Sequence, residues 1–250
     1  MFVSVALLQR RRADQHQGEK LGFGAICRAR HIVRTLGGRF SLELGIELDR
    51  DAAEPERWAL AVTLLGNRIS TTVAMRTYRV LEHAGIRTIA DAGSRSREEL
   101  VALLDEGGYA RYDERTATRL HALASAIEDR HEGRLGSLGE RTGSSSKLEQ
   151  ALLALPGWGP VTVRAFLREL RGVWPAADPQ LDGRCALAAH HLGLPSGTHS
   201  LSALAASAHL DFRDLEAALL RLSLCHDLAS CPGGEECPFA AFDREQLVHF

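Results

Sequence analysis

The nine residues Leu-Pro-Gly-Trp-Gly-Pro-Val-Thr-Val at positions 155–163 constrain the fold most, because they end one helical pattern and begin another. Apolar residues recur at helical spacing on both sides, over residues 148–155 and 161–170. A proline–glycine pair is typical of a helix end, and Pro160 suits the first turn of the helix that follows. The pattern therefore predicts two helices joined by a tight hairpin.

This predicted hairpin provides a possible binding site for an anion. Backbone N–H groups at a glycine turn and in the first turn of a helix have no partner inside the helix and point outward. The groups in question belong to Gly157, Gly159, Val161 and Thr162. Arg164 follows on the same helix and adds positive charge, although exposed arginines also commonly form a solvated face. The segment thus predicts contact with a phosphate, and a plain connecting turn is the alternative.

A second set of motifs follows the hairpin: Arg-Gly-Val-Trp-Pro at residues 171–175 and Leu-Asp-Gly-Arg at residues 181–184. In this order the chain resembles the helix-hairpin-helix-Gly/Pro/Asp superfamily of DNA glycosylases, which includes endonuclease III and the adenine glycosylases. There, a Leu-Pro-Gly-x-Gly hairpin precedes a Gly/Pro-rich bend and an essential aspartate at a helix start. Residues 64–70 look like the family's first core helix and its turn, and residues 107–109 like its Gly-x-Tyr helix connection. The resemblance covers about residues 28–240 and rests on the order of the motifs.

Helical periodicity predicts an all-α protein, and the resemblance implies two helical lobes with a DNA-binding cleft between them. The expected core lobe is residues 53–173 and ends in the helix-hairpin-helix. The second lobe combines residues 23–52 with residues 174–250, which include a Cys-containing C-terminal loop. Residues 1–22 lack periodicity and are expected to form a flexible tail. Alternation of apolar and polar residues over 40–51 indicates an extended segment.

The resemblance implies hydrolysis of the bond between a base and its sugar. A carboxylate near the sugar can stabilise its oxocarbenium-like cation and can orient or deprotonate the attacking water. Asp182 matches the family's aspartate and is the candidate catalytic residue, and Arg184 beside it is a candidate DNA-binding residue. An aspartate at this position also suits the N-cap of a helix.

The hairpin departs from endonuclease III at one position. Bifunctional relatives carry a lysine two residues after the second glycine, and its amine attacks the sugar to form a Schiff base that leads to strand cleavage. Val161 stands at that position, and the two lysines of the chain, Lys20 and Lys147, match no motif. We therefore expect a monofunctional DNA N-glycosylase of base excision repair, a hydrolase without AP lyase activity, that acts on a damaged or mispaired base.

Several alternatives stay open. The chain could be a bifunctional glycosylase/AP lyase of endonuclease III type, or a non-catalytic relative that binds damaged or bent DNA. A helical protein-interaction module is a third possibility, which predicts no salt-dependent duplex binding. Adenine specificity is not transferred, because the adenine glycosylases add a glutamate in the first core helix and residues 58–71 contain no acid. The excised base is left open, since pocket shape and contacts to exocyclic groups determine it.

Base excision also requires that the base leave the stack and that the gap be filled. Arg68 stands where the family often places a glutamine that fills the duplex, so it is a candidate for that role or for phosphate binding. Tyr109 and Tyr112 are candidates for the base pocket, with core packing at a helix joint as the alternative.

Three cysteines near the C terminus, Cys225, Cys231 and Cys237, are separated by five residues each. Many members of the family hold a 4Fe–4S cluster at this place with four cysteines. This chain has one too few, so we expect no cofactor. The alternatives are a 4Fe–4S cluster at a degenerate motif, completed by His226 or another ligand, and a zinc ion.

Composition bears on partners and location. The formal net charge of −2 argues against binding nucleic acid through overall charge, so duplex binding would depend on local arginines. No apolar run approaches the length of a transmembrane helix, and the five cysteines do not resemble a secreted disulfide framework. We therefore expect a cytoplasmic, bacterial-type, nucleoid-associated monomer that avoids membranes and binds double-stranded DNA containing a lesion or mismatch.

Overall fold

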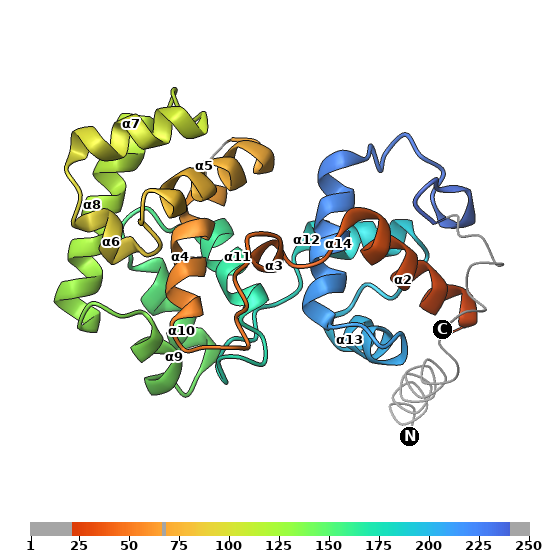
Figure 1. Cartoon of the computed structure of the whole chain (residues 1–250). Helices are drawn as coiled ribbons and strands as arrows, with labels where there is room; N and C mark the ends of the chain where they lie inside the picture. The colour runs from red at the N-terminus through yellow and green to blue at the C-terminus, as the bar shows by residue number, and fades with distance from the viewer. Residues whose placement is uncertain (1–21, 67–68, 241–250) are drawn as a thin grey trace, which may run out of the picture. The chain divides into compact units, whose positions relative to one another are not determined.

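The computed structural model of the chain describes residues 22–66 and 69–240 (Figure 1). These residues form helices and turns without a β-strand, apart from one isolated bridge between Arg171 and Trp174. The all-α prediction is confirmed. The extended segment predicted over 40–51 is wrong, because a short helix and a series of turns occupy it. The tail predicted at residues 1–22 lies, except for Gly22, outside the described residues.

The described residues divide into two compact units. Unit 1 takes those of Met1–Gly38 and Leu181–Phe250, and unit 2 those of Arg39–Gln180. This division differs from the expected lobes at residues 39–52 and 174–180, which lie in unit 2. The segment 39–52 is held in unit 2 by the buried carboxylate of Glu169, which accepts backbone N–H groups of this segment.

Unit 2 is built around one helix. Its elements are α3 (Phe40–Glu43), α4 (Glu54–Leu65), α5 (Thr71–His83), α6 (Ile89–Gly93), α7 (Arg97–Gly107), α8 (Asp113–His131), α9 (Gly136–Arg141), α10 (Ser145–Leu153) and α11 (Pro160–Glu169). Every residue of α4 from Trp58 to Leu64 is buried, and α4 packs against α5, α6 and α11 (Figure 1). A helix that is apolar on all sides belongs in the interior, which explains why this segment organises the unit.

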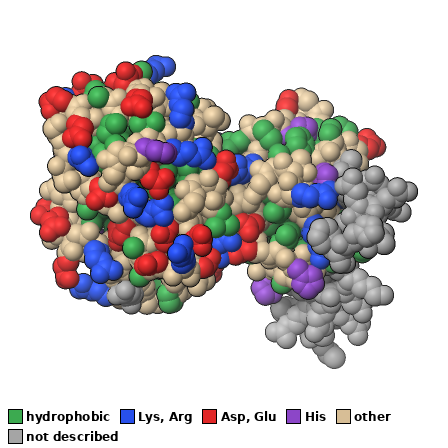
Figure 2. All heavy atoms as spheres, viewed as in Figure 1, with side chains coloured by type: hydrophobic (Ala, Val, Ile, Leu, Met, Phe, Trp, Pro, Cys, Tyr) green, Lys and Arg blue, Asp and Glu red, His purple; other side chains and the backbone are tan. Residues whose placement is uncertain are grey.

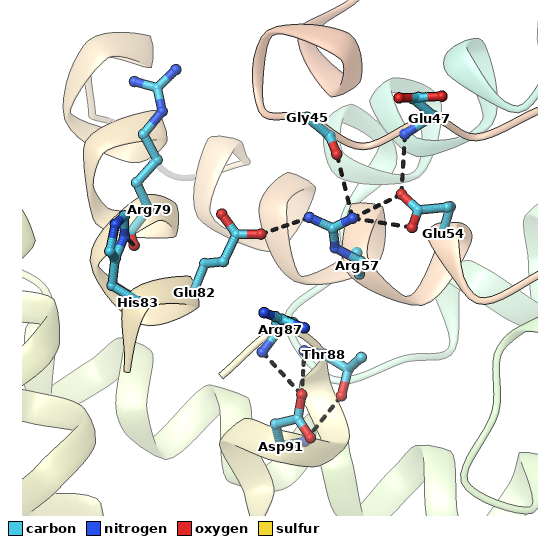
Figure 3. Close-up of polar contacts among 10 residues, drawn as sticks. All are labelled: Gly45, Glu47, Glu54, Arg57, Arg79, Glu82, His83, Arg87, Thr88 and Asp91. Carbon is cyan, nitrogen blue, oxygen red and sulfur yellow. Dashed lines mark hydrogen bonds and ion pairs between the residues drawn. The ribbon is translucent and has the colours of Figure 1, made fainter. Parts of the chain in front are cut away.

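Helix starts in unit 2 follow the expected capping chemistry. The side chains of Ser70, Thr88 and Ser96 each accept an N–H three residues ahead and so begin α5, α6 and α7. At α6 the cap is reciprocal, because Asp91 accepts the N–H of Thr88 at 2.9 Å (Figure 3). These local signals place the turns between helices where glycine, serine and threonine stand in the sequence.

Arg57 of α4 links three parts of unit 2 (Figure 3). Its guanidinium donates to Glu54 at 3.0 Å, to Glu82 of α5 at 2.6 Å, and to the carbonyl of Gly45 at 3.3 Å. The planar guanidinium has donors in several directions, so one side chain can satisfy all three acceptors. This network fixes α5 and the turn after α3 against α4.

A buried carboxylate fixes the start of α3. Glu169, at the end of α11, is completely buried and accepts the backbone N–H groups of Phe40 at 3.0 Å and Ser41 at 2.8 Å. Arg168 lies 3.6 Å from the same carboxylate and balances its charge. The two N–H donors are the first of α3, and they would otherwise be buried without an acceptor.

Glu169→Gln is expected to lower the free energy of unfolding by about 1–3 kcal/mol, because a buried N–H of α3 then faces an amide nitrogen. Urea unfolding of the full chain measures the change. The exposed Glu149→Gln on α10 is the control and should stay within about 0.5 kcal/mol of the parent. Equal stability of both variants would show that α3 is held by other contacts.

Unit 1 packs three α-helices around a fourth. Its elements are α2 (Phe23–Leu36), α12 (Gly183–His191), α13 (Thr198–Ser207), α14 (Phe212–Cys225) and the 3-10 helix η1 (Gly234–Glu236). Helix α14 contacts α2, α12 and α13. Buried alanines such as Ala188, Ala205 and Ala218 lie in this core and let the helix backbones approach closely. Among the described helices of the chain, none is long and apolar enough to span a membrane.

Candidate functional site

The segment between α10 and α11 forms a tight turn. Helix α10 ends at Leu153, α11 begins at Pro160, and the N–H of Trp158 donates to the carbonyl of Leu155 at 3.1 Å. Gly157 has φ of +79°, in the left-handed region that L side chains rarely adopt. The turn therefore needs glycine at this position.

Trp158 anchors the turn to the core. Its ring is only 3 % exposed and packs edge-to-face on Phe166 of α11, with 5.0 Å between the centroids. Its indole Nε1 donates to Thr63 of α4 at 2.9 Å, and Thr63 in turn donates to the carbonyl of Ala59 at 2.7 Å. The turn is thus held on the most buried helix of unit 2.

The start of α11 presents backbone donors. The first intrahelical bond runs from the N–H of Val163 to the carbonyl of Gly159 at 3.0 Å. Within the part of the chain that the structure describes, the backbone N–H groups of Gly157, Gly159, Val161 and Thr162 have no hydrogen-bond acceptor, whereas that of Trp158 donates to Leu155. The side chain of Val161 is 72 % exposed, whereas that of Thr162 is buried against Gly66. Any contact of Thr162 with a ligand would therefore use its N–H.

Positive charge beside the turn comes from two helices. Arg164 lies half-buried on α11. The side chain of Arg119 of α8 runs alongside Gly157. A Cβ atom added at Gly157 would lie only 2.3 Å from the Cδ atom of Arg119. Burial, and then the like charge of Arg115, lowers the pKa of the Arg119 guanidinium. Sequence analysis missed Arg119, because only the packing of α8 brings it to the turn.

Charge elsewhere on unit 2 is mixed. On the face shown in Figure 2, acidic and basic side chains are interspersed over this unit. This distribution agrees with the formal net charge of −2. The arginines at the turn are therefore a local feature, and overall charge gives no general attraction for nucleic acid.

Asp182 is the N-cap of α12. Its Oδ1 accepts the backbone N–H of Arg184 at 2.8 Å, and the residue is half-buried. The capping bond fixes the orientation of the carboxylate. The Arg184 residue is exposed. Both residues belong to unit 1, whereas the turn and its arginines belong to unit 2.

The remaining predicted DNA contacts fall in different places. Tyr109 is completely buried and its hydroxyl donates to the carbonyl of Leu64, which is the position of a core residue. Tyr112 is half-buried at the start of α8, with the Arg111 guanidinium 5.7 Å from its ring centroid. Arg68 lies outside the described residues.

A group of metal-ligating side chains lies in unit 1. One donor atom from each of His191, His226, Cys231 and Cys237 lies within 4.8 Å of the others. Cys225 is outside this group; it is exposed, and its Sγ lies 3.8 Å from the carbonyl of Leu222. The predicted set of three cysteines is therefore replaced by two cysteines and two histidines.

Two side chains of this group, those of His191 and Cys237, lie in surroundings that favour their neutral forms. Burial, followed by the neighbouring His226, lowers the pKa of His191. Burial likewise raises the pKa of the Cys237 thiol, and the nearby Cys231 adds to the shift. Sequence analysis named His226 as a possible ligand but missed His191, which lies on another helix and is brought close only by the fold.

The structure thus offers three features for function: the donors at the turn, the capped carboxylate of Asp182, and the His/Cys group. No protein-family model matches the chain, and no curated protein matches it either.

Proposed function

We propose that the chain is a DNA glycosylase that hydrolyses the N-glycosidic bond of a damaged or mispaired base in duplex DNA. The observation that carries the proposal is the turn before α11. It combines a left-handed Gly157 with backbone N–H groups that have no acceptor among the described residues. Such groups at the start of a helix bind anions well, and in DNA the anion is a phosphate.

The phosphate-binding role is supported by rigidity and charge. Trp158 holds the turn against α4, so its donors are oriented before a ligand arrives. Arg119 adds a cation beside the turn, and Arg164 adds another on α11. Neutralising a phosphate with such cations releases counterions, so the proposed binding weakens as salt rises.

Asp182 is the proposed catalytic carboxylate. Its capping bond to Arg184 fixes its orientation, and no covalent step is needed for it to stabilise a sugar cation or orient a water. Val161, at the start of α11, has an exposed side chain without a nucleophilic atom, so this position provides no amine. These two residues together favour hydrolysis without strand cleavage.

Val161→Lys is expected to add strand cleavage, because it places an amine at an exposed position at the start of α11, directly after the turn. Borohydride should then trap a covalent complex with damaged duplex that the parent does not give. Val161→Gln, similar in length and polar but unable to form a Schiff base, is the matched control. If the lysine variant cleaves no better than the glutamine variant, the turn does not lie beside the reacting sugar.

The experiment that tests the function is incubation of the purified protein with duplexes that each carry one lesion or mismatch, followed by strand analysis with and without alkali. Breakage only after alkali indicates a monofunctional glycosylase and names the substrate. Breakage without alkali indicates that another amine acts as nucleophile. Salt-dependent binding with no breakage across a broad panel would replace the proposal with a non-catalytic DNA-binding protein, and no binding at all would reject a role on DNA.

A further inference from the structure

The His/Cys group lies where three segments of unit 1 meet. His191 ends α12, His226 follows α14 directly, and Cys231 and Cys237 lie in the following loop, before and after η1 respectively. Cys237 is completely buried, and the Nε2 atom of His191 is buried without a hydrogen-bond partner in the described part of the chain. A buried polar atom without a partner is destabilising, and a bound ligand at this place would remove that cost.

The residues do not fit a 4Fe–4S cluster. Such a cluster is held by four cysteine thiolates, each on a separate iron. Only two cysteines of this loop are in the group, since Cys225 is exposed and outside it. In the two-iron clusters that use histidine, both histidines bind one iron and both cysteines the other, which separates the two kinds of ligand. Here Sγ of Cys237 lies 3.7 Å from Nε2 of His226, so the two kinds are adjacent.

The spacing of the donor atoms fits one small ion. Tetrahedral zinc with Zn–S near 2.3 Å and Zn–N near 2.0–2.1 Å places its ligand atoms about 3.3–3.8 Å apart. The distance of 3.7 Å between Cys237 and His226 falls in this range, and all four donors lie within 4.8 Å. Small side-chain adjustments would bring them to coordination distance.

We propose that His191, His226, Cys231 and Cys237 bind one structural Zn²⁺ ion. Two thiolates and two imidazoles form a Cys₂His₂ set with a net charge of zero around the ion, and this set is typical of structural zinc. Four protein ligands leave no open position for water, so the ion has no catalytic role. Binding requires that the two thiols lose their protons.

The loop backbone is shaped for close approach to α12. Gly233 has φ of +77°, and a side-chain carbon there would lie 2.8 Å from the carbonyl oxygen of His191. Only glycine lets the loop pass this close to the helix end. The ion then joins the C-terminal ends of α12 and α14 to the loop, and its binding free energy adds to the stability of unit 1.

The test is the metal content of the purified full-length chain. The chain is titrated with Zn²⁺ alone and dialysed against metal-free buffer, and the bound metal is then measured by elemental analysis. We expect one zinc per chain in the parent and in Cys225→Ser, the matched control outside the group, and almost none in Cys231→Ser or His191→Ala. A strong chelator should lower the melting temperature of the parent by several degrees, and added Zn²⁺ should restore it. The same chelator should leave the melting temperature of the Cys231→Ser variant unchanged.

Replacement by Co²⁺ keeps the proposal testable if the variants fail to fold. Cobalt bound to two thiolates in a tetrahedral site absorbs strongly in the visible range, and this absorption should appear in the parent and disappear on adding Zn²⁺. Iron with acid-labile sulfide would overturn the proposal in favour of a cluster. Failure to bind Zn²⁺ under reducing conditions, or a Cys231–Cys237 disulfide in freshly purified protein, would also overturn it. None of these results depends on DNA activity.

Discussion

Replacing Asp182 by asparagine is expected to lower the rate of base release by about 10²–10⁴-fold, with the fold and duplex binding intact. Asparagine caps a helix as well as aspartate does, and its side-chain oxygen can still accept the N–H of Arg184. The variant therefore removes the negative charge and little else. Single-turnover base release on the substrate found by the lesion panel measures the loss, and circular dichroism verifies the fold.

Asp211 provides the matched control for this experiment. It caps α14 as Asp182 caps α12, with its Oδ1 accepting the N–H of Arg213 at the same distance of 2.8 Å. Asp211→Asn should leave the rate of base release unchanged, although it weakens the ion pair with Arg213. Equal losses in both variants would assign the effect of Asp182→Asn to capping, and the catalytic role would be rejected.

Replacing Trp158 by alanine is expected to lower the free energy of unfolding by about 3–5 kcal/mol. The substitution removes a ring that is 3 % exposed, its edge-to-face contact with Phe166, and the hydrogen bond to Thr63. The proposed phosphate binding should weaken as well, because the turn loses the contacts that hold its donors in place. Urea unfolding of the full chain and salt-dependent duplex binding measure the two effects.

Two further variants separate the parts of this effect. Trp158→Phe keeps most of the apolar volume but loses the indole donor, and the expected destabilisation is about 1–3 kcal/mol. The exposed Val161→Ala lies in the same turn region and should stay within about 0.5 kcal/mol of the parent. If Trp158→Ala is no less stable than Val161→Ala, the aromatic contact does not hold the turn.

Local signals in the sequence predicted the two ends of the turn and the start of α12. Proline and glycine at residues 156–160 have strong backbone preferences, so α11 begins where the pattern indicates, whereas α10 ends at Leu153, two residues before the predicted end. Asp182 likewise caps a helix because its short side chain reaches an N–H two residues ahead. Each of these outcomes depends on residues close together in the chain.

The segment after α2 shows where local pattern failed. Alternating apolar and polar residues over 40–51 predicted an extended piece, but Phe40–Glu43 is helical. The carboxylate of Glu169, more than a hundred residues away in the chain, accepts the first N–H groups of this helix and holds its start in unit 2. A short stretch of sequence does not reveal an acceptor that is distant in the chain. Here the contacts of that acceptor outweighed the weak local preference for an extended conformation.

The sequence by itself determined the helical class, the caps, the turn at Gly157 and the absence of an amine at residue 161, because each follows from neighbouring residues and their backbone preferences. Tertiary structure alone decided three things: Tyr109 became a core residue, Arg119 came to lie beside the turn, and His191 joined His226 and two cysteines while Cys225 was left exposed. In each case the partners belong to segments that are distant in the chain, and only the packing of those segments sets the distances between their side chains.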